Sequence, residues 1–241
     1  TRHGVRRQRQ MCIRDRRHKD LKNGLSAPPK LTPATVANLM TKWSWGIEML
    51  GAKRRDFGNI VGHVKGVSDT SSLGSWTADQ FDPALDWGKV QKLMEQWGGK
   101  VILKGILDVE DAKMAAKLGA DAIVVSNHGG RQLDGALSSI RYLRPIVDAV
   151  GDKVEVHFDS GIRSGQDVLK ALAMGARGTY IGRAFVYGLG AMGQAGVESA
   201  LEVIRKELDT SMALCGRRDV NTLDRDILLV PEDFEGRWAQ N

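Results

Sequence analysis

The chain has 241 residues, of which 42% are hydrophobic, and a formal net charge of +6. This length fits one α/β barrel, one doubly wound domain or two small domains, and no apolar run approaches the roughly 18 residues that span a bilayer. Residues 1–22 hold nine Lys and Arg but only two Asp, so the rest of the chain has a net charge of −1. Because the basic charge is confined to this tail, we expect no nucleic-acid partner.

The N-terminal tail has an unusual sequence. The stretch QMCIRDR, Gln10 to Arg16, corresponds to one reading frame of a common transposase-type sequencing adapter. We therefore predict that residues 1–16 are not native protein; the alternative is a genuine basic arm that is disordered. No apolar segment follows the charged N-terminus, so no signal peptide is expected. Cys12 and Cys215 lack metal or redox spacing, and no metal site is predicted.

Residues 34–66 combine apolar and basic side chains. The apolar set is Met40, Trp43, Trp45, Met49 and Leu50, and the basic set is Lys53, Arg54, Arg55 and Lys65. Aromatic and basic side chains together are typical of a segment that lies in a membrane interface. The alternative is an amphipathic helix that packs on the protein's own core, and the sequence leaves both hypotheses open.

From residue 98 onward, strand-like and helix-like patterns alternate. Short apolar runs predict strands at 101–104, 121–127, 153–161 and 178–185. Amphipathic patterns predict helices at 108–120, 137–151, 164–176 and 195–208, the first with Asp108 as its N-cap and Gly119 at its end. Strands that alternate with such helices form a parallel sheet. The predicted fold class is α/β, with about half of the strands of a (β/α)8 barrel.

Polar residues follow all four predicted strands. They are Lys104; Ser126, His128 and Arg131; the stretch Asp159 to Arg163; and Gly182 with Arg183. Ligands of parallel α/β folds bind at the C-terminal ends of the strands, so we expect these residues to converge. Two glycine-rich loops after the last two strands, together with the helix N-terminus near Ser164, predict a phosphate site.

The loop SNHGGRQLDG contains two residues whose side chains could act in catalysis or in ligand binding. The imidazole of His128 can take a proton from a hydroxyl group, and the guanidinium of Arg131 can bind a carboxylate with two hydrogen bonds. The loop could therefore bind a 2-hydroxy acid, although a solvated polar turn is the better explanation of a His–Arg pair taken by itself. Lys104 is either an ion-paired strand lysine or a cation that faces an anionic cofactor.

These stretches resemble the FMN-dependent family that oxidises α-hydroxy acids, which includes L-lactate dehydrogenases, glycolate oxidases and mandelate dehydrogenases. The resemblance runs from about residue 17 to 230, is strongest to the L-lactate dehydrogenases, and rests on LKGIL, SNHGGRQLDG, DSGIRSGQDVLKALAMGA, IGRAF and MALCG. It implies a (β/α)8 barrel with FMN at its mouth. It also implies oxidation of an L-2-hydroxy acid, with L-lactate favoured, to the 2-oxo acid.

The resemblance assigns a role to each predicted site residue. It implies that His128 is the catalytic base, that Arg131 binds the substrate carboxylate and that Lys104 contacts the isoalloxazine ring. The remaining cofactor-binding residues would be Ser126, Asp159, Ser160, Gly161, Arg163, Gly182 and Arg183. The substrate hydride would pass to the flavin while His128 removes the hydroxyl proton, and a carbanion route is the alternative.

The resemblance also predicts how the chain is divided. Residues 17–97 would be the long loop and helices after the fourth barrel strand, 98–230 the FMN-binding half of the barrel, and 231–241 a C-terminal tail. The N-terminal half of the barrel would be absent, together with an aspartate that orients the catalytic histidine. We therefore expect the 241-residue chain to be incomplete and inactive alone.

Several properties of the full-length protein follow as expectations from the family. It would be a homo-oligomer, either cytoplasmic or bound peripherally to the inner face of the cell membrane through residues 34–66. Its electron acceptor would be oxygen, a quinone or a cytochrome. Two other functions remain open: another phosphate-binding barrel enzyme, such as a flavin-dependent isomerase or an aldolase-like protein, and a non-catalytic half-barrel that binds a partner.

Overall fold

The computed structural model describes residues 32–52, 60, 63, 64, 76, 85–133, 135–231 and 234. The chain divides into two compact units; described residues 32–76 belong to one and described residues 85–234 to the other. The predictions for residues 1–16, and for the basic residues of 53–66, lie outside the described residues. The domain boundaries expected from the sequence stay a prediction.

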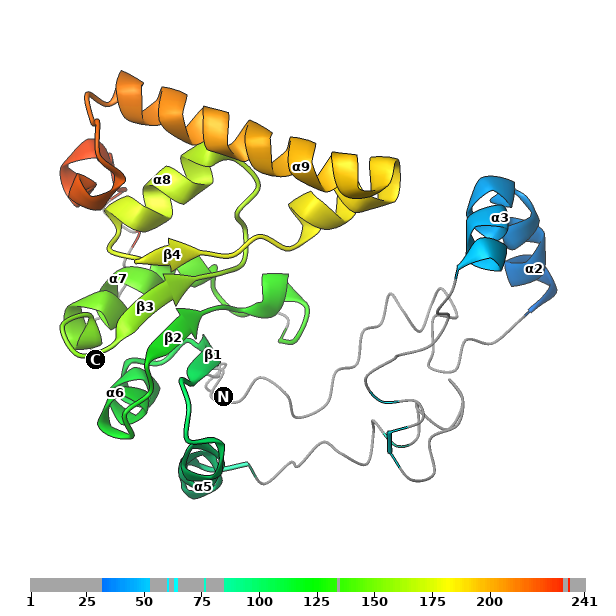
Figure 1. The fold of residues 1–241 in the computed structure, drawn as a ribbon. Coiled ribbons are helices and arrows are strands. Elements are labelled where there is room, and N and C mark those ends of the chain that lie inside the picture. The colour runs from blue at the N-terminus through cyan, green and yellow to red at the C-terminus, as the bar shows by residue number, and fades with distance from the viewer. Residues whose placement is uncertain are drawn as a thin grey trace, which may run out of the picture. The chain divides into compact units, whose positions relative to one another are not determined.

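The larger unit is built on a four-stranded parallel sheet (Figure 1). Its strands lie in chain order: β1 (Ile102–Ile106), β2 (Ala122–Val125), β3 (Glu155–Phe158) and β4 (Gly178–Thr179). Helices α6 (Val109–Lys117), α7 (Ser139–Val150) and α8 (Gly165–Ala173) connect successive strands and lie along one side of the sheet. The α/β fold class predicted from the strand and helix alternation is therefore confirmed.

The core lies between the sheet and these helices. Ile123, Val125, Val156 and Phe158 alternate with residues of the opposite face and are almost fully buried, together with Leu143 and Ile146 of α7. Alternate residues of a strand point to the same face, so the apolar side chains of neighbouring strands form one continuous layer. All four residues of β2 are buried, and this strand has a neighbour on each edge.

The ends of the helices follow the expected capping chemistry. Asp108 is the N-cap of α6 and accepts a hydrogen bond from the backbone N–H of Glu110 at 2.9 Å, and Gly119 follows that helix with a φ of 82°. Both predictions for this helix are confirmed. Helix α5 (Trp87–Trp97) is capped by Asp86 and packs through Trp87 and Met94 on the core.

The last strand and helix differ from the sequence prediction. The strand expected at 178–185 is limited to two residues, and the helix expected at 195–208 is part of α9 (Arg183–Leu214), which breaks at Met192 and Gly193. The reason is a close approach of Gly188 and Gly196, at which any side chain would collide with the backbone of the other segment. Glycines have low intrinsic helix propensity, so the amphipathic pattern of the sequence predicted a shorter helix than the one observed.

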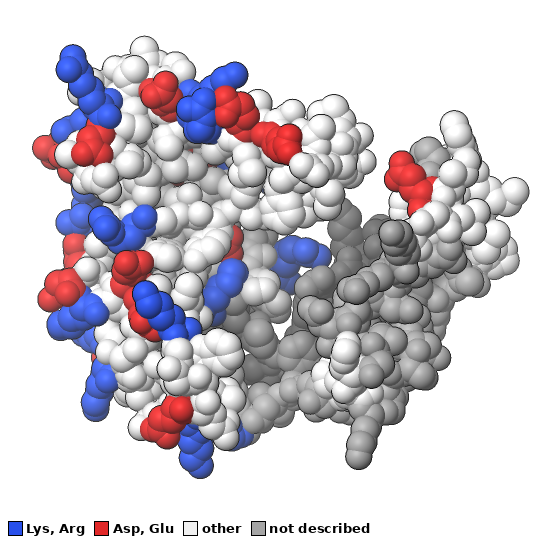
Figure 2. Space-filling model, in the orientation of Figure 1, with Lys and Arg blue, Asp and Glu red and all other residues white. Residues whose placement is uncertain are grey.

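The remaining elements are short. In the described part of the chain, short 3-10 helices lie between β2 and α7, η1 (His128–Gly130), and after α9, η2 (Val220–Thr222) and η3 (Arg225–Ile227). The smaller unit contains α2 (Pro33–Met40) and α3 (Trp43–Gly51), whose large apolar side chains are mostly exposed. Among the described residues, no helix combines the length and the apolar character that crossing a membrane requires. On the face drawn in Figure 2, acidic and basic side chains of the larger unit are intermixed.

Candidate active site

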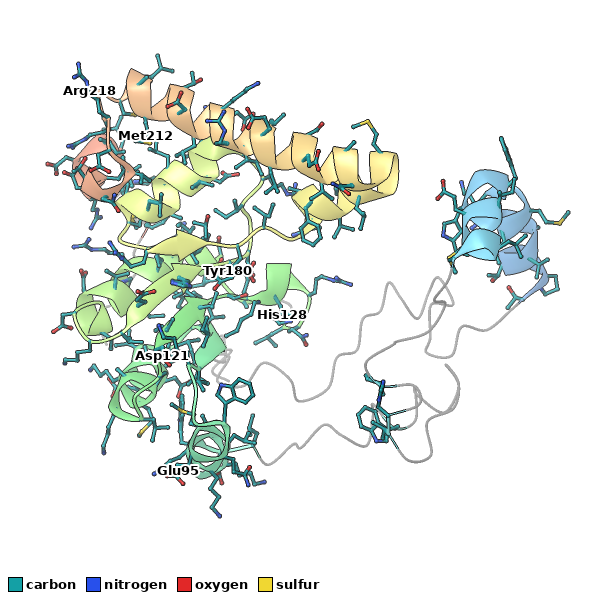
Figure 3. All side chains as sticks on the ribbon, in the orientation of Figure 1. Glu95, Asp121, His128, Tyr180, Met212 and Arg218 are labelled. Carbon is teal, nitrogen blue, oxygen red and sulfur yellow. The ribbon has the colours of Figure 1, made fainter. Side chains whose placement is uncertain are left out.

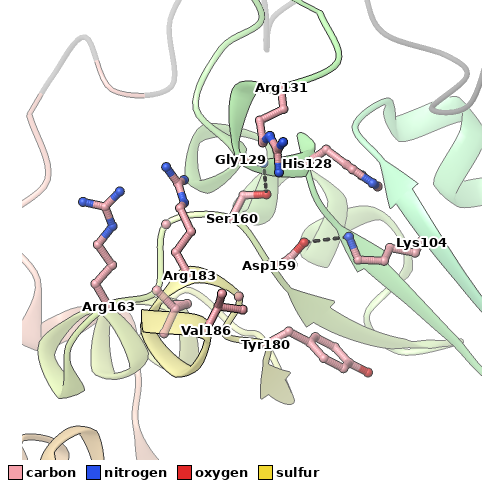
Figure 4. A pocket seen from close by; sticks show the side chains of 13 residues that line it. Lys104, His128, Gly129, Arg131, Asp159, Ser160, Arg163, Tyr180, Arg183 and Val186 are labelled. Atoms are coloured by element: carbon pink, nitrogen blue, oxygen red, sulfur yellow. Dashed lines mark hydrogen bonds and ion pairs between the residues drawn. The ribbon is translucent and has the colours of Figure 1, made fainter. Parts of the chain in front are cut away.

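A cavity of about 320 Å³ opens at the C-terminal ends of β1, β3 and β4 and beside the loop after β2 (Figure 4). Figure 3 labels His128 in that loop and Tyr180 directly after β4, with Asp121 at the opposite end of β2. The lining residues are Lys104, His128, Gly129, Arg131, Asp159, Ser160, Gly161, Ile162, Arg163, Tyr180, Gly182, Arg183 and Val186. The cavity volume lies within the range of small-molecule binding sites.

A charged network links three strands at the base of the cavity. The Lys104 Nζ atom donates to Asp159 Oδ2 at 2.7 Å and to the Ser126 hydroxyl at 3.1 Å. The Ser126 hydroxyl donates in turn to Asp159 Oδ2 at 2.6 Å. Ser126 is fully buried, whereas 43% of the Lys104 side chain is exposed. The ammonium group is thus held at the cavity wall.

The Asp159 carboxyl is ionised by its surroundings. Partial burial acts to raise its pKa, but the hydrogen bonds from Lys104 and Ser126 and the positive charge of Lys104 outweigh that effect. The pKa of Asp159 is therefore held below its usual value. An ionised carboxylate can keep accepting both hydrogen bonds across the neutral pH range.

The loop that carries His128 has an unusual backbone. His128, Gly129 and Gly130 have φ values of 58°, 69° and 72°, in the left-handed region that costs a non-glycine residue about 1–3 kcal/mol. Two hydroxyls compensate: the buried Ser126 Oγ accepts from the His128 N–H at 3.1 Å, and the half-buried Ser160 Oγ accepts from the Gly129 N–H at 3.0 Å. These contacts fix the direction in which the imidazole leaves the backbone.

The loop after β3 is held in a similar way. Ser160 and Gly161 have φ values of 84° and 113°. The hydroxyl of Ser139, at the start of α7, lies 3.0 Å from the carbonyl oxygen of Asp159 and 3.1 Å from that of Ser160. Ser139 is 1% exposed, so it stabilises this loop from beneath rather than facing the cavity.

Three guanidinium groups gather along one rim of the cavity. They belong to Arg131, Arg163 and Arg183 and lie on the same side of the site in Figure 4. A Cβ atom at Gly129 would lie 3.1 Å from Arg183 Nη2, so glycine at this position leaves room for that side chain. Three cations beside glycine-rich loops are suited to bind a dianion such as a phosphate.

The helix N-terminus expected to bind that phosphate is occupied by the protein itself. The N–H groups of Arg163 and Ser164 donate to Asp167 Oδ2, and the N–H of Gly165 donates to Glu207 Oε2 at 2.9 Å. These three donors are already used, and the contribution of the N-terminus of α8 to a phosphate site stays a prediction. Helix α9 is different: its N-cap, Gly182, and its first residue, Arg183, line the cavity, and no side chain caps the helix there.

Comparison with known proteins identifies the family. A sequence profile described as FMN-dependent dehydrogenase matches residues 11–230. The chain belongs to this family. The resemblance inferred from the sequence motifs is thereby confirmed, and the FMN-dependent dehydrogenases are a family of (β/α)8 barrels to which a half-barrel of four parallel strands conforms.

Curated relatives of the FMN-dependent dehydrogenase family cover most of the chain. An L-lactate dehydrogenase from Caulobacter vibrioides is 45% identical over 219 residues, which is 90% of this chain and 57% of that protein. An L-lactate dehydrogenase from Pseudomonas paraeruginosa is 43% identical over 221 residues, covering 91% and 58%. The chain thus spans a little over half the length of the curated relatives that it matches.

Solved structures of the FMN-dependent dehydrogenases share the fold. A structure of the monotopic membrane protein (S)-mandelate dehydrogenase superposes with a TM-score of 0.85 at 32% identity and covers 91% of this chain and 58% of that chain. A mandelate oxidase bound to (S)-4-hydroxymandelic acid superposes with a TM-score of 0.60 at 47% identity, covering 64% and 43%. The partial-barrel fold predicted from the sequence is confirmed.

Most residues predicted for the site lie together. Nine of the ten line the cavity, and the tenth, Ser126, contacts Lys104 from below. Sequence reasoning missed Tyr180, which lines the cavity, and His157, which contacts it. His157 could have been found from the period of two along β3, because it shares a face with Glu155 and Asp159 follows on that same face.

Proposed function

We propose that the full-length protein oxidises an L-2-hydroxy acid, L-lactate foremost, to the 2-oxo acid with FMN as its cofactor. The observation that carries this proposal is the convergence on one cavity of a histidine, an arginine beside it, a strand lysine and two glycine–arginine loops. The family and the naming of its curated relatives as L-lactate dehydrogenases support it. Family membership also favours it over an isomerase or an aldolase-like enzyme.

The cavity has the features that FMN requires. Arg163, Arg183 and the N–H groups near Gly161 and Gly182 would bind the phosphate, which needs cations and unoccupied backbone donors. Ser126, Asp159 and Ser160 would support that wall through their hydrogen bonds. Lys104 would place its positive charge against the ring. FMN, when bound, supplies the group that accepts the substrate hydride.

The substrate would lie against the loop after β2. Arg131 would bind its carboxylate with two parallel hydrogen bonds, which fixes the orientation of the α-carbon. His128, as the neutral imidazole, would take the proton of the α-hydroxyl while the hydride leaves the α-carbon. The left-handed backbone at His128 supports this role, because strained residues held by several contacts are frequent at active sites.

The proposal is tested by flavin spectroscopy on the full-length protein. We expect the purified protein to contain FMN and to lose its visible absorption when L-lactate is added anaerobically. The variant His128→Gln should retain the flavin and lose the bleaching, because it keeps the loop but lacks the base. A protein that lacks flavin, or bleaching that survives in His128→Gln, would contradict the proposal.

We further propose that turnover requires more of the barrel than this chain contains. Among the described strands, β1 and β4 each have a neighbour on one edge alone. Further parallel strands would cover these edges and close the cavity. The purified 241-residue chain is expected to show no L-lactate oxidation in the presence of added FMN, and steady-state turnover by it would overturn this expectation.

We also propose a membrane contact through the smaller unit. Met40, Trp43, Ile47 and Leu50 of α2 and α3 are 77%, 72%, 62% and 74% exposed. Exposed aromatic and aliphatic side chains on short helices are suited to the membrane interface, and one similar structure is of a monotopic membrane protein. The variant Trp43→Ser/Leu50→Ser should lose co-sedimentation with anionic liposomes; unchanged pelleting would reject the contact.

The other expected properties stay predictions. The cytoplasmic location, the homo-oligomeric state and the choice among oxygen, a quinone and a cytochrome as acceptor rest on the family resemblance. Reoxidation of the lactate-reduced protein by air, compared with reoxidation by a soluble quinone, distinguishes an oxidase from a dehydrogenase.

A further inference from the structure

Ser160 has a backbone conformation that a glycine would adopt with less strain. Its φ of 84° lies in the left-handed region, where a side chain crowds the backbone. The next residue has a φ of 113° and is a glycine, Gly161, which meets no such cost. A serine at position 160 therefore needs an explanation in the contacts that it makes.

The backbone of Ser160 is held from beneath by another serine. The hydroxyl of Ser139 lies 3.0 Å from the carbonyl oxygen of Asp159 and 3.1 Å from that of Ser160, and Ser139 is 1% exposed. Because both acceptors are backbone oxygens, a glycine at position 160 would keep these contacts. They explain how the conformation is tolerated, but not why the side chain is that of serine.

The side chain of Ser160 contacts the loop after β2. The Gly129 N–H donates to Ser160 Oγ at 3.0 Å, a bond drawn in Figure 4. Ser160 Oγ also lies 3.2 Å from Ser126 Oγ, and Ser126 donates its own hydrogen to Asp159 at 2.6 Å. A chain of hydrogen bonds thus runs from Gly129 through two hydroxyls to an ionised carboxylate, and bonds in such a chain strengthen one another.

The bond to Gly129 acts on the orientation of His128. Two peptide planes meet at the His128 Cα atom: the N–H of one is bound by Ser126 Oγ at 3.1 Å, and the N–H of the other, which belongs to Gly129, is bound by Ser160 Oγ. With both planes held, the direction of the Cα–Cβ bond is fixed. Since His128 has a φ of 58°, loss of one bond would let it relax toward less strained backbone conformations and turn its imidazole.

We propose that Ser160 is a positioning residue, whose hydroxyl acts through Gly129 to hold the His128 imidazole in its orientation at the cavity. The inference rests on the proposed function, because it takes His128 as the catalytic base. It explains why a serine stands where a glycine would be less strained. Loss of the hydroxyl is accordingly expected to lower turnover rather than flavin content.

Two variants that lack the hydroxyl but differ in backbone strain test the proposal in the full-length protein. Glycine can adopt a φ of 84° freely and alanine cannot, so Ser160→Gly should melt about 2–4 °C above Ser160→Ala. The kcat with L-lactate should nevertheless fall about 10-fold in both variants, because a catalytic group that is misplaced by up to 1 Å loses up to about 100-fold in rate. If Ser160→Gly kept the native kcat, the serine would serve stability alone and the proposal would fail.

The matched control is Ser138→Ala, at the other end of the same loop. Ser138 is exposed and makes no side-chain capping hydrogen bond to α7. This variant should keep the native kcat, and an equal loss of kcat in it would reject a specific role of Ser160. The flavin content of both Ser160 variants should stay native; lost flavin with an unchanged kcat per bound flavin would show that the hydroxyl binds the cofactor instead.

Amide hydrogen exchange resolved to single residues tests the contact without substrate. In the full-length protein, the Gly129 amide should exchange at least about fivefold faster in both Ser160 variants, as expected for one lost hydrogen bond, and at the native rate in Ser138→Ala. Unchanged exchange at Gly129 would overturn the proposal, whatever the kinetics show. If the exchange rises as expected but the native protein does not oxidise L-lactate, the proposed function fails, whereas the role of Ser160 in holding His128 is supported.

Discussion

Arg131 illustrates how much the choice of a single side chain matters at the cavity rim. Arg131 and His128 lie on one short loop, and both line the cavity. Lysine has the same charge but lacks the planar pair of donors that matches a carboxylate. The identity of the residue, and not only its charge, is therefore expected to determine substrate binding.

Replacing Arg131 by Lys should weaken substrate binding selectively. We expect the KM for L-lactate in the full-length protein to rise on the order of 10- to 100-fold, since hydrogen bonds to charged groups are worth roughly 1.5–3 kcal/mol. FMN content should stay unchanged. The matched control is Arg144→Lys, an exposed pair with Asp148 on α7. Lost flavin with an unchanged KM would show that Arg131 binds the cofactor instead.

The ion pair of Asp159 with Lys104 should make stability depend on pH. The folded-state pKa of Asp159 is lowered, so its contribution is complete above the unfolded value of about 4 and is lost as the pH falls through the folded value. Since Lys104 is partly exposed, we expect the ion pair to add about 1 kcal/mol to the free energy of unfolding.

Urea denaturation of the native chain and of Asp159→Asn measures this effect. The difference in unfolding free energy should be constant from pH 5 to 8 and should shrink below about pH 4. A difference that is the same at pH 3 and pH 7 would mean that Asp159 stabilises the loop by its shape rather than by its charge.

At the scale of the elements, α8 and α9 pack so closely at Gly165 that no side chain fits there. A Cβ atom at Gly165 would collide with the backbone of Glu207 and Leu208, and the Gly165 N–H donates to the Glu207 carboxylate. The negative charge of Glu207 at the N-terminus of α8 is favourable. This contact holds together the two helices that follow the glycine-containing loops of the cavity.

Gly165→Ala should therefore destabilise the protein by about 2–3 kcal/mol, in the range of overpacked sites. The control is Gly190→Ala, which lies in α9 with open space around it and should be neutral or stabilising by up to about 1 kcal/mol. Thermal unfolding of both variants compares them directly. Equal melting temperatures would show that α8 and α9 can separate without cost.

The two-residue period and the capping residues were enough to predict β2, β3 and the helices between the strands. They could not predict α9, because its break depends on Gly188 meeting Gly196, which is a contact and not a pattern. The same holds for the site. The strand ends located the charged residues, but the pairing of His157 with Tyr180 links residues 23 positions apart and follows only from the register of β3 and β4.

At the scale of the whole molecule, the arrangement of the strands determines which part of the sheet is stable. β2 and β3 have a neighbour on each side, whereas the described part of the chain offers no partner for the outer edges of β1 and β4. The unpaired backbone groups of an edge strand exchange with water and can pair with another chain. Ile102 at the start of β1 is 50% exposed, in keeping with such an edge.

Amide hydrogen exchange should reveal this order of stability. In the 241-residue chain, the amides of β2 should exchange slowest, whereas the outward-facing amides of β1 should exchange at least about 100-fold faster, because opening them breaks no strand pairing. The measurement is made at two protein concentrations. Slow exchange in β1 at high concentration only would mean that a second copy covers the edge; slow exchange at both would mean that residues outside the described ranges cover it. Either result would contradict the open edge, and fast exchange at both would support the proposal that further barrel strands are required for turnover.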